Sequence, residues 1–209
     1  MCGRFYIDDD LKEDLDSLLK DLNQKLKDGL NYKAGEVFPT NHAVVLVKDK
    51  KHAEVVKWGY PGWKNKGVIF NARSESVLQK KMFEKGFTKN RCLIPVSGFY
   101  EWNHGKEKYY FHLQNEKVLY LGGIMDEFQG EKCFTILTRE ADVIMEPIHN
   151  RMPVVIAAEA ADTWLSSLQD AKQIVRKPQP ALKAQLASGH TISTQPEYEQ
   201  IHIFNTFDL

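Results

Sequence analysis

The residue with the most distinctive potential chemistry is Cys2, which becomes the first residue of the chain once Met1 is removed. An N-terminal cysteine carries an α-amine and a thiol two carbons apart, and such groups titrate near ~8 and ~8.5. Modest changes in their surroundings therefore make both groups nucleophilic around neutral pH. Gly3 follows directly and allows the backbone to approach a ligand closely. A cysteine at the second position can also occur by chance, so the other motifs must show whether Cys2 has a function.

An amide and a guanidinium follow the short apolar segment 68–70. Asn71 and Arg73 are two positions apart and share one face if the strand continues through them. Arginine can hold a phosphate through two parallel hydrogen bonds, and asparagine can bond a sugar hydroxyl or a base edge. A strand-to-helix cap with a surface ion pair is the structural alternative.

A carboxylate lies between large aromatic residues in the segment 97–102. Partial burial would raise the pKa of Glu101 and allow it to act as an acid or a base. Trp102 could stack on an unpaired base. The alternative is a glutamate on the solvated face of a strand.

A histidine lies in the loop 146–153, which contains two prolines and leads into the apolar run 154–156. Loops that enter strands often carry catalytic groups. Histidine is the side chain best suited to general acid-base catalysis near neutral pH, which makes His149 a candidate. An ordinary surface histidine would fit the same pattern, so this motif indicates a catalytic role only in combination with the other motifs.

The elements that must position these side chains are mainly strands. A hairpin is predicted over 44–58, and further β-rich segments lie at 92–96, 99–102, 108–113, 118–124, 133–138 and 199–204. Leucines at the helical period predict a helix that Asp8 caps and that ends near Gly29, and helical patterns return at 158–168 and 180–187. We therefore expect an α+β fold with a mainly antiparallel sheet, curled toward a barrel, and peripheral helices.

Length and composition favour one domain over residues 1–209 and limit the possible partners. Lys and Arg number 28, as do Asp and Glu, so nucleic acid would bind in a local groove rather than to a globally basic surface. No apolar stretch approaches the roughly 20 residues of a membrane span, and no secretory signal is present, so we expect a cytoplasmic protein. The three cysteines lack metal-ligand spacing, so we expect no metal or other cofactor.

Several short motifs follow one another along nearly the whole chain. They are MCGRF at 1–5, Pro39-Thr40, Trp58-Gly59 with Pro61 and Trp63, Asn71-Ala72-Arg73, RCLIP at 91–95, GFYEW at 98–102 and HNRMP at 149–153. In this order they resemble the motifs of the SOS-response-associated peptidase (SRAP) family, and the set is far more specific than any single motif. The resemblance implies a single SRAP domain that binds single-stranded DNA containing abasic sites.

The resemblance also implies a catalytic role for four residues. Cys2 would condense with the ring-opened aldehyde of an abasic deoxyribose, the amine forming an imine and the thiol closing it to a thiazolidine. Asn71 would hydrogen-bond the bound site, and Glu101 would assist proton transfer and ring opening. His149 would support imine chemistry, reversal and any lyase activity. The covalent product would shield the lesion in the DNA damage response.

The DNA contacts implied by the resemblance are of two kinds. Phosphate contacts are expected from Arg4, Arg73 and Arg151, and apolar wedges or stacking surfaces from Pro39, Met82 and Trp102. Relatives often carry arginine around the Met-Phe element, whereas this chain has lysines in the segment 80–85, so salt-sensitive lysine contacts would replace one guanidinium. A monomer that associates with the nucleoid when on DNA is expected.

The peptidase label of the family refers to release of Met1, either autocatalytically with Cys2 as nucleophile or by a cellular aminopeptidase. Two other functions are compatible with parts of the pattern. Glutamine amidotransferases with an N-terminal nucleophile also begin Met-Cys-Gly, but the chain has no Asn-Gly or Gly-Asp dipeptide of the kind their glutamine pockets use. In a non-catalytic single-strand binding module, Trp102 and the arginines would bind DNA and Cys2 would be incidental.

Overall fold

The computed structural model describes residues 2–22, 31–50, 52–62, 66–187 and 199–200. Its centre is a closed barrel of five strands, because β11 pairs with both β8 and β12 and so completes the ring. The barrel strands, in spatial order, are β12 (Glu131–Glu140), β4 (Ala53–Trp58), β3 (His42–Leu46), β8 (Arg91–Val96) and β11 (Leu119–Phe128). Only the β12–β4 pair in this ring is parallel, which confirms the expected mainly antiparallel, barrel-like sheet.

Three short strands extend the barrel sheet. They are β7 (Asn71–Arg73) and β13 (Arg151–Pro153), which pair with β12, and β14 (Val155–Ile156), which pairs with β11. Thr138 of β12 is in register with Arg73 in β7 and with Pro153 in β13. The two motifs that contain Asn71 and His149 therefore lie on opposite sides of one strand.

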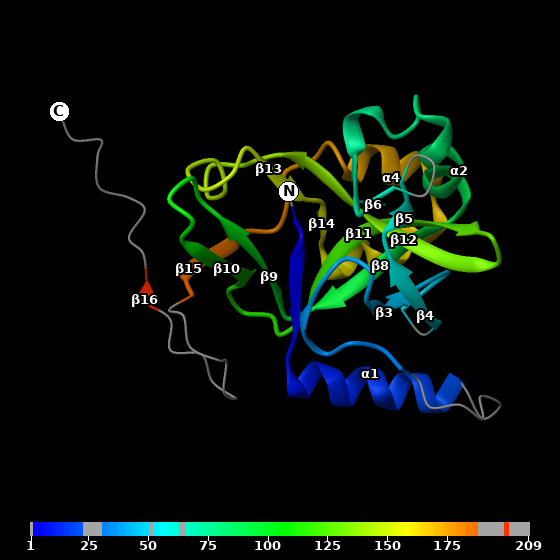
Figure 1. Ribbon diagram of the computed structural model, residues 1–209, viewed down its shortest axis with the longest axis horizontal. Coiled ribbons are helices and arrows are strands. Elements are labelled where there is room, and N and C mark those ends of the chain that lie inside the picture. The colour runs from blue at the N-terminus through cyan, green and yellow to red at the C-terminus, as the bar shows by residue number, and fades with distance from the viewer. Residues whose placement is uncertain (1, 23–30, 51, 63–65, 188–198, 201–209) are drawn as a thin grey trace.

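A second sheet is antiparallel throughout and packs beside the barrel (Figure 1). Its strands, in spatial order, are β16 (Glu199–Gln200), β15 (Leu182–Leu186), β10 (Lys108–Leu113), β9 (Gly98–Trp102), β1 (Arg4–Ile7) and β2 (Gly35–Val37). In β1, Phe5 and Ile7 are buried while Arg4 and Tyr6 are partly exposed. This alternation places the two faces of the sheet in different surroundings. A separate two-stranded hairpin pairs β5 (Tyr60–Pro61) with β6 (Val68–Ile69).

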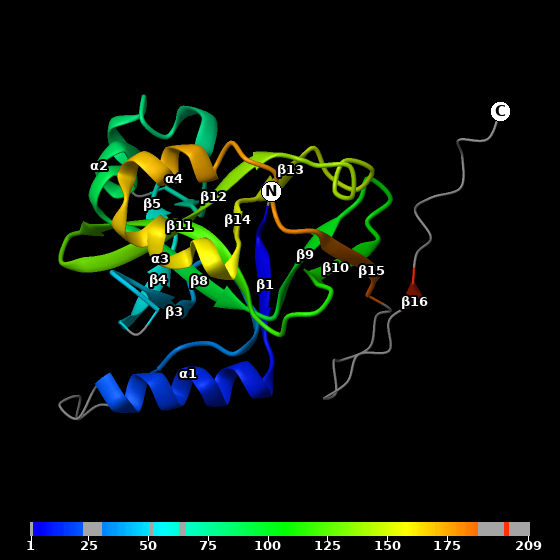
Figure 2. The same cartoon turned by 180° about the vertical axis from the view of Figure 1, so that it is seen from behind.

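The helices lie outside the barrel (Figures 1 and 2). In the described part of the chain they are α1 (Asp9–Leu22), α2 (Lys81–Lys89), α3 (Ala161–Ser166) and α4 (Leu168–Ile174), with 3₁₀ turns η2 (Ser74–Ser76) and η3 (Ala158–Ala160). The expected cap of the first helix is present, because Asp8 Oδ1 accepts a 2.8 Å hydrogen bond from Leu11 N. The predicted end of this helix near Gly29 lies outside the described residues.

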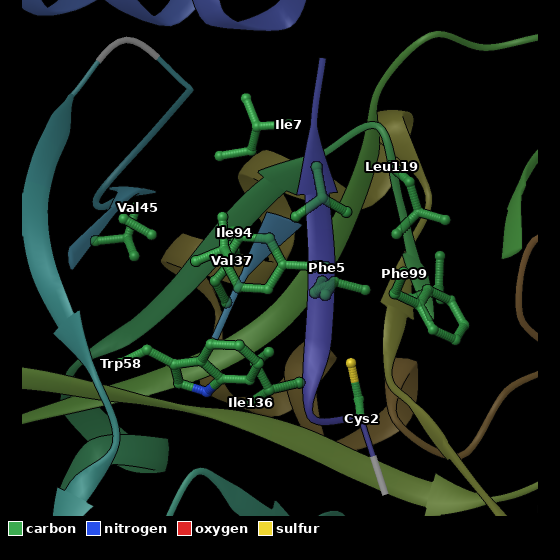
Figure 3. Close-up of a cluster of buried hydrophobic side chains, with 14 of the residues drawn as sticks. Cys2, Phe5, Ile7, Val37, Val45, Trp58, Ile94, Phe99, Leu119 and Ile136 are labelled. Carbon is green, nitrogen blue, oxygen red and sulfur yellow. The ribbon is translucent and has the colours of Figure 1, made fainter. Parts of the chain in front are cut away.

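The larger hydrophobic core fills the barrel and continues to the start of the chain (Figure 3). Trp58, buried completely, contacts the rings of Phe5 and Phe134 at centroid distances of 4.9 and 6.2 Å. Its indole nitrogen donates to the carbonyl of Phe70 at 3.0 Å. Cys2 belongs to this same cluster, so the first residues of the chain are part of the core rather than a tail.

One sequence prediction of a helix was wrong, and a second was confirmed with a break in it. The segment 180–187 contains strand β15, because its residues pair along the edge of β10 from Leu182↔Leu113 to Leu186↔Tyr109. The predicted helix over 158–168 is divided, and Ser167 begins α4 by accepting a hydrogen bond from Asp170 N. Of the predicted strand 199–204, only residues 199–200 are described.

Candidate functional site

Cys2 lies at the entry to β1 and is fully buried (Figure 3). Its thiol donates a weak hydrogen bond to the carbonyl of Arg4, with Sγ 3.9 Å from the oxygen. Its own carbonyl accepts a 2.8 Å hydrogen bond from Asn71 Nδ2. Both the side chain and the backbone of the proposed nucleophile are therefore held in place.

Asn71 reaches Cys2 because β7 is attached in parallel to the end of β12, with Asn71 in register with Ile136. The amide oxygen Oδ1 of Asn71 is buried and has no hydrogen-bond partner among the described residues. A buried acceptor without a partner is costly and seldom found in folded proteins. It therefore marks a position where the N–H or O–H of a ligand would gain a bond.

Glu101 lies on β9 and is 5% exposed. Its Oε2 accepts a hydrogen bond from Trp102 N at 3.3 Å. Burial raises the pKa of the Cys2 thiol well above its usual range, and the negative charge of Glu101 raises it further. The thiol is therefore protonated in this state, with a carboxylate near enough to influence its proton.

His149 lies in the loop before β13 and is half-buried. Its Nδ1 accepts a 3.0 Å hydrogen bond from Arg151 N, so in the neutral ring the proton is on Nε2. Nε2–H can then serve as a donor or an acid. The predicted catalytic residue is thus held by the backbone of the motif that contains it.

Arg151 is predicted to contact phosphate. Its two terminal nitrogens donate hydrogen bonds to the two carboxylate oxygens of Glu75, at 2.7 and 2.9 Å. One of these nitrogens also donates to Thr138 Oγ1 at 3.3 Å. The hydrogen bond from Arg151 holds the pKa of Glu75 below its usual range. The buried Nε of Arg151 has no hydrogen-bond partner among the described residues.

The remaining predicted DNA contacts are distributed over the surface. Arg4 lies over the rings of Phe38 and Trp102, with Cζ 4.3 and 5.0 Å from their centroids. Pro39 follows Phe38 in the turn after β2 and is half-buried. The other two residues are exposed at the start or end of short elements: Arg73 at the end of β7, and Met82 in the first turn of α2.

The structure thus connects Cys2 directly with Asn71 and places it within the electrostatic influence of Glu101. It connects Arg4 with Trp102 on the surface. Sequence reasoning missed the acidic partners Glu75 and Glu36, the second of which pairs with Arg4 at 3.2 Å. These partners are 76 and 32 positions away along the chain, and such separations leave no local pattern to detect.

A cavity of about 360 Å³ opens next to Glu75 and is lined in part by Arg139, Lys172 and Arg176. None of the four predicted catalytic residues lines it. In the described ranges, no three histidine, cysteine, aspartate or glutamate side chains are grouped to hold a metal ion. Within those ranges there is likewise no helix with the length and apolar character needed to span a membrane.

Comparison with known proteins identifies related sequences. The family model "SOS response associated peptidase (SRAP)" matches residues 1–195. Abasic site processing protein YoqW of Bacillus subtilis is 28% identical over 184 residues, covering 79% of this chain and 80% of the relative. Abasic site processing protein YedK of Escherichia coli is 28% identical over 179 residues, covering 79% of each chain.

Solved structures share the fold. A protein from Bordetella bronchiseptica superposes with a TM-score of 0.72 at 21% identity, covering 90% of this chain and all of that chain. A protein from Bacteroides thetaiotaomicron superposes with a TM-score of 0.70 at 20% identity, covering 90% of this chain and 93% of that chain. These likenesses establish the overall fold.

Proposed function

This chain belongs to the SRAP family, and on that premise we propose that it captures abasic sites in single-stranded DNA as a covalent adduct of Cys2. The names of its relatives, abasic site processing proteins, support a role in processing this lesion. The observation that carries the proposal is the hydrogen bond from Asn71 to the carbonyl of Cys2, beside the charge of Glu101. The three residues come from three separate motifs, and a nucleophile, its positioning group and a proton acceptor are the parts that the chemistry needs.

The first step is hydrolysis of the Met1–Cys2 peptide bond, which consumes water and frees the α-amine of Cys2. The amine then attacks the aldehyde carbon of the ring-opened abasic sugar, and loss of water gives an imine. Addition of the Cys2 sulfur to the imine carbon closes a five-membered thiazolidine, and the thiol proton ends on nitrogen. We assign the carboxylate of Glu101 as the acceptor of this proton, because its charge raises the pKa of the buried thiol after burial itself.

The burial of Cys2 suits this sequence of steps. A protonated, buried thiol is inert toward solutes, so it reacts only when a sugar is delivered to it. Asn71 Oδ1 would accept a hydrogen bond from the amine or from a sugar hydroxyl. His149, with its proton on Nε2, would assist imine hydrolysis, reversal and any strand cleavage.

The DNA strand would contact Arg4, Arg73 and Arg151 through its phosphates. The apolar and stacking contacts would come from Pro39, Met82 and Trp102. Arg4 and Trp102 already lie together on the surface, and stacking of a cation and a base on one ring is a common way to hold single strands. We further propose that the protein acts as a monomer and that residues 1–209 form one domain in the cytoplasm, on the nucleoid when bound to DNA.

The test is incubation with a single-stranded oligonucleotide carrying one abasic site, followed by intact-mass measurement and a denaturing gel. We expect a protein that has lost Met1 and gained one oligonucleotide. Cys2→Ala should form no adduct while retaining affinity for the strand, and Cys133→Ala, which alters another buried cysteine, should cross-link like the wild type. A protein without Met1 that gains no oligonucleotide, or equal cross-linking by Cys2→Ala, would refute the proposal.

A further inference from the structure

The outer face of the second sheet carries a cluster of three charged side chains, of which the proposed function uses only Arg4. Glu36 on β2 accepts hydrogen bonds from Arg4 on β1, at 3.2 Å, and from Lys108 on β10, at 2.6 Å. Both bonds go to the same atom, Oε1. One carboxylate oxygen therefore occupies the point where two cations converge.

Aromatic rings hold the two cations in place. Lys108 Nζ lies 3.8 Å from the ring centroid of Tyr100 and 5.6 Å from that of Trp102. Arg4 Cζ lies 5.0 Å from the same Trp102 ring and 4.3 Å from Phe38. The register explains this arrangement, because Arg4 is opposite Tyr100 and Lys108 is opposite Trp102 in the sheet.

The position of the cluster follows from the strand that contains Cys2. Arg4 is the first residue of β1, and its carbonyl accepts the hydrogen bond of the Cys2 thiol. Trp102 directly follows Glu101 on β9, so the charged outer face and the buried carboxylate meet at the same end of the sheet. A strand whose sugar reaches Cys2 would therefore carry its neighbouring phosphate across this face.

The electrostatic balance favours an anion here. Although burial favours the neutral form of Glu36, the hydrogen bonds and charges of Lys108 and Arg4 together hold the pKa of Glu36 below its usual range. The three side chains are 27% to 36% exposed, and ion pairs with that access to water are weak. A phosphate offers more acceptor oxygens to the same two cations than the single carboxylate oxygen that now holds them.

We propose that Arg4 and Lys108 form one phosphate-binding site for the backbone of single-stranded DNA, and that Glu36 occupies this site until DNA displaces it. The inference rests on the proposed function and adds Lys108 as a DNA contact and Glu36 as an internal competitor. Because the cations are already ordered over aromatic rings, the bound strand loses little affinity to side-chain ordering. A DNA strand that places no phosphate at this point leaves Glu36 paired with Arg4 and Lys108.

The experiment measures equilibrium binding of an intact, fluorescently labelled single-stranded oligonucleotide, without an abasic site, over a series of salt concentrations. We expect Lys108→Gln to weaken binding about threefold to tenfold and to reduce the magnitude of the salt slope by about 0.7, the value for one phosphate contact. Glu36→Gln should tighten binding by a similar factor, because the competitor is removed. Lys108→Arg should retain wild-type affinity, which separates loss of charge from loss of folding.

The matched controls are Glu54→Gln and Lys132→Gln, which make the same charge changes in an ion pair on the β4–β12 side of the barrel. Each should bind the oligonucleotide as the wild type does. Binding by Lys108→Gln with unchanged affinity and salt slope, or equal tightening by Glu36→Gln and Glu54→Gln, would overturn the inference. Cross-linking to an abasic oligonucleotide is measured in parallel: its absence, with the expected effects on intact DNA, would refute the proposed function alone.

Discussion

The sharpest test of the site is Asn71→Ala. The substitution removes the 2.8 Å hydrogen bond to the carbonyl of Cys2 and leaves that carbonyl without this donor. A buried backbone acceptor that loses its partner costs about 1 to 3 kcal/mol. If that free energy positions Cys2 for attack, adduct formation slows by about 5-fold to 150-fold, because about 1.4 kcal/mol corresponds to a factor of ten in rate.

The assay is single-turnover cross-linking to an abasic oligonucleotide, with thermal unfolding measured on the same preparations. For a chain of this size we expect the melting temperature to fall by about 2 to 12 °C. Asn71→Asp should slow the reaction as much as Asn71→Ala, since a carboxylate keeps the shape of the side chain but cannot donate to the carbonyl.

The matched control is Gln179→Ala, which removes another side-chain bond to the backbone, from Val155 N to Gln179 Oε1 at 2.6 Å. It should lower the melting temperature and leave the cross-linking rate unchanged. The reasoning is refuted if Asn71→Ala cross-links at the wild-type rate. It is refuted equally if both variants slow the reaction in proportion to their loss of stability.

Two further predictions concern charge. Burial raises the pKa of the Cys2 thiol, and the charge of Glu101 raises it further. Because the thiolate is the nucleophile, Glu101→Gln should move the rise of the cross-linking rate with pH to lower pH, while loss of the proton acceptor lowers the maximal rate. An unchanged pH–rate profile would remove Glu101 from the mechanism. Glu75→Gln breaks the pair with Arg151 and, after discounting for the exposure of Glu75, should cost about 0.5 to 1 kcal/mol of stability. Since the pKa of Glu75 is lowered in the folded state, this contribution is present above its ordinary pKa and is lost as pH falls through the lowered value. Urea unfolding should therefore show the variant and the wild type converging in acid, and a constant difference would contradict the assignment.

The motif residues could be read from the sequence because each motif is local. Trp102 directly follows Glu101, and Arg151 lies two positions after His149, so those pairs are neighbours in any fold. The bond between Asn71 and the carbonyl of Cys2 joins residues 69 positions apart, and no local pattern encodes it. The family resemblance grouped these residues, and the physical contact follows from the attachment of β7 to β12.

The errors have a common physical origin. Residues 182–186 carry helix-compatible side chains, yet the open edge of β10 offers backbone hydrogen bonds that outweigh this local preference. The pair of Arg151 with Glu75 was not predicted for a similar reason, because it exists only after η2 is placed beside β13. In both cases a tertiary contact acts that the local sequence does not show.

The placement of β1 between β2 and β9 has a consequence for biosynthesis. The strand needs β2 on one side and β9 on the other, and Phe5 pairs with Phe99. At ribosomal speeds of about 5 to 20 residues per second, roughly 5 to 20 s pass between synthesis of the start of the chain and synthesis of its partner strand. Cys2 is fully buried in the folded protein. If an aminopeptidase performs the proposed removal of Met1, we expect it to act during that interval, whereas the proposed autocatalytic removal by Cys2 would follow closure of the sheet.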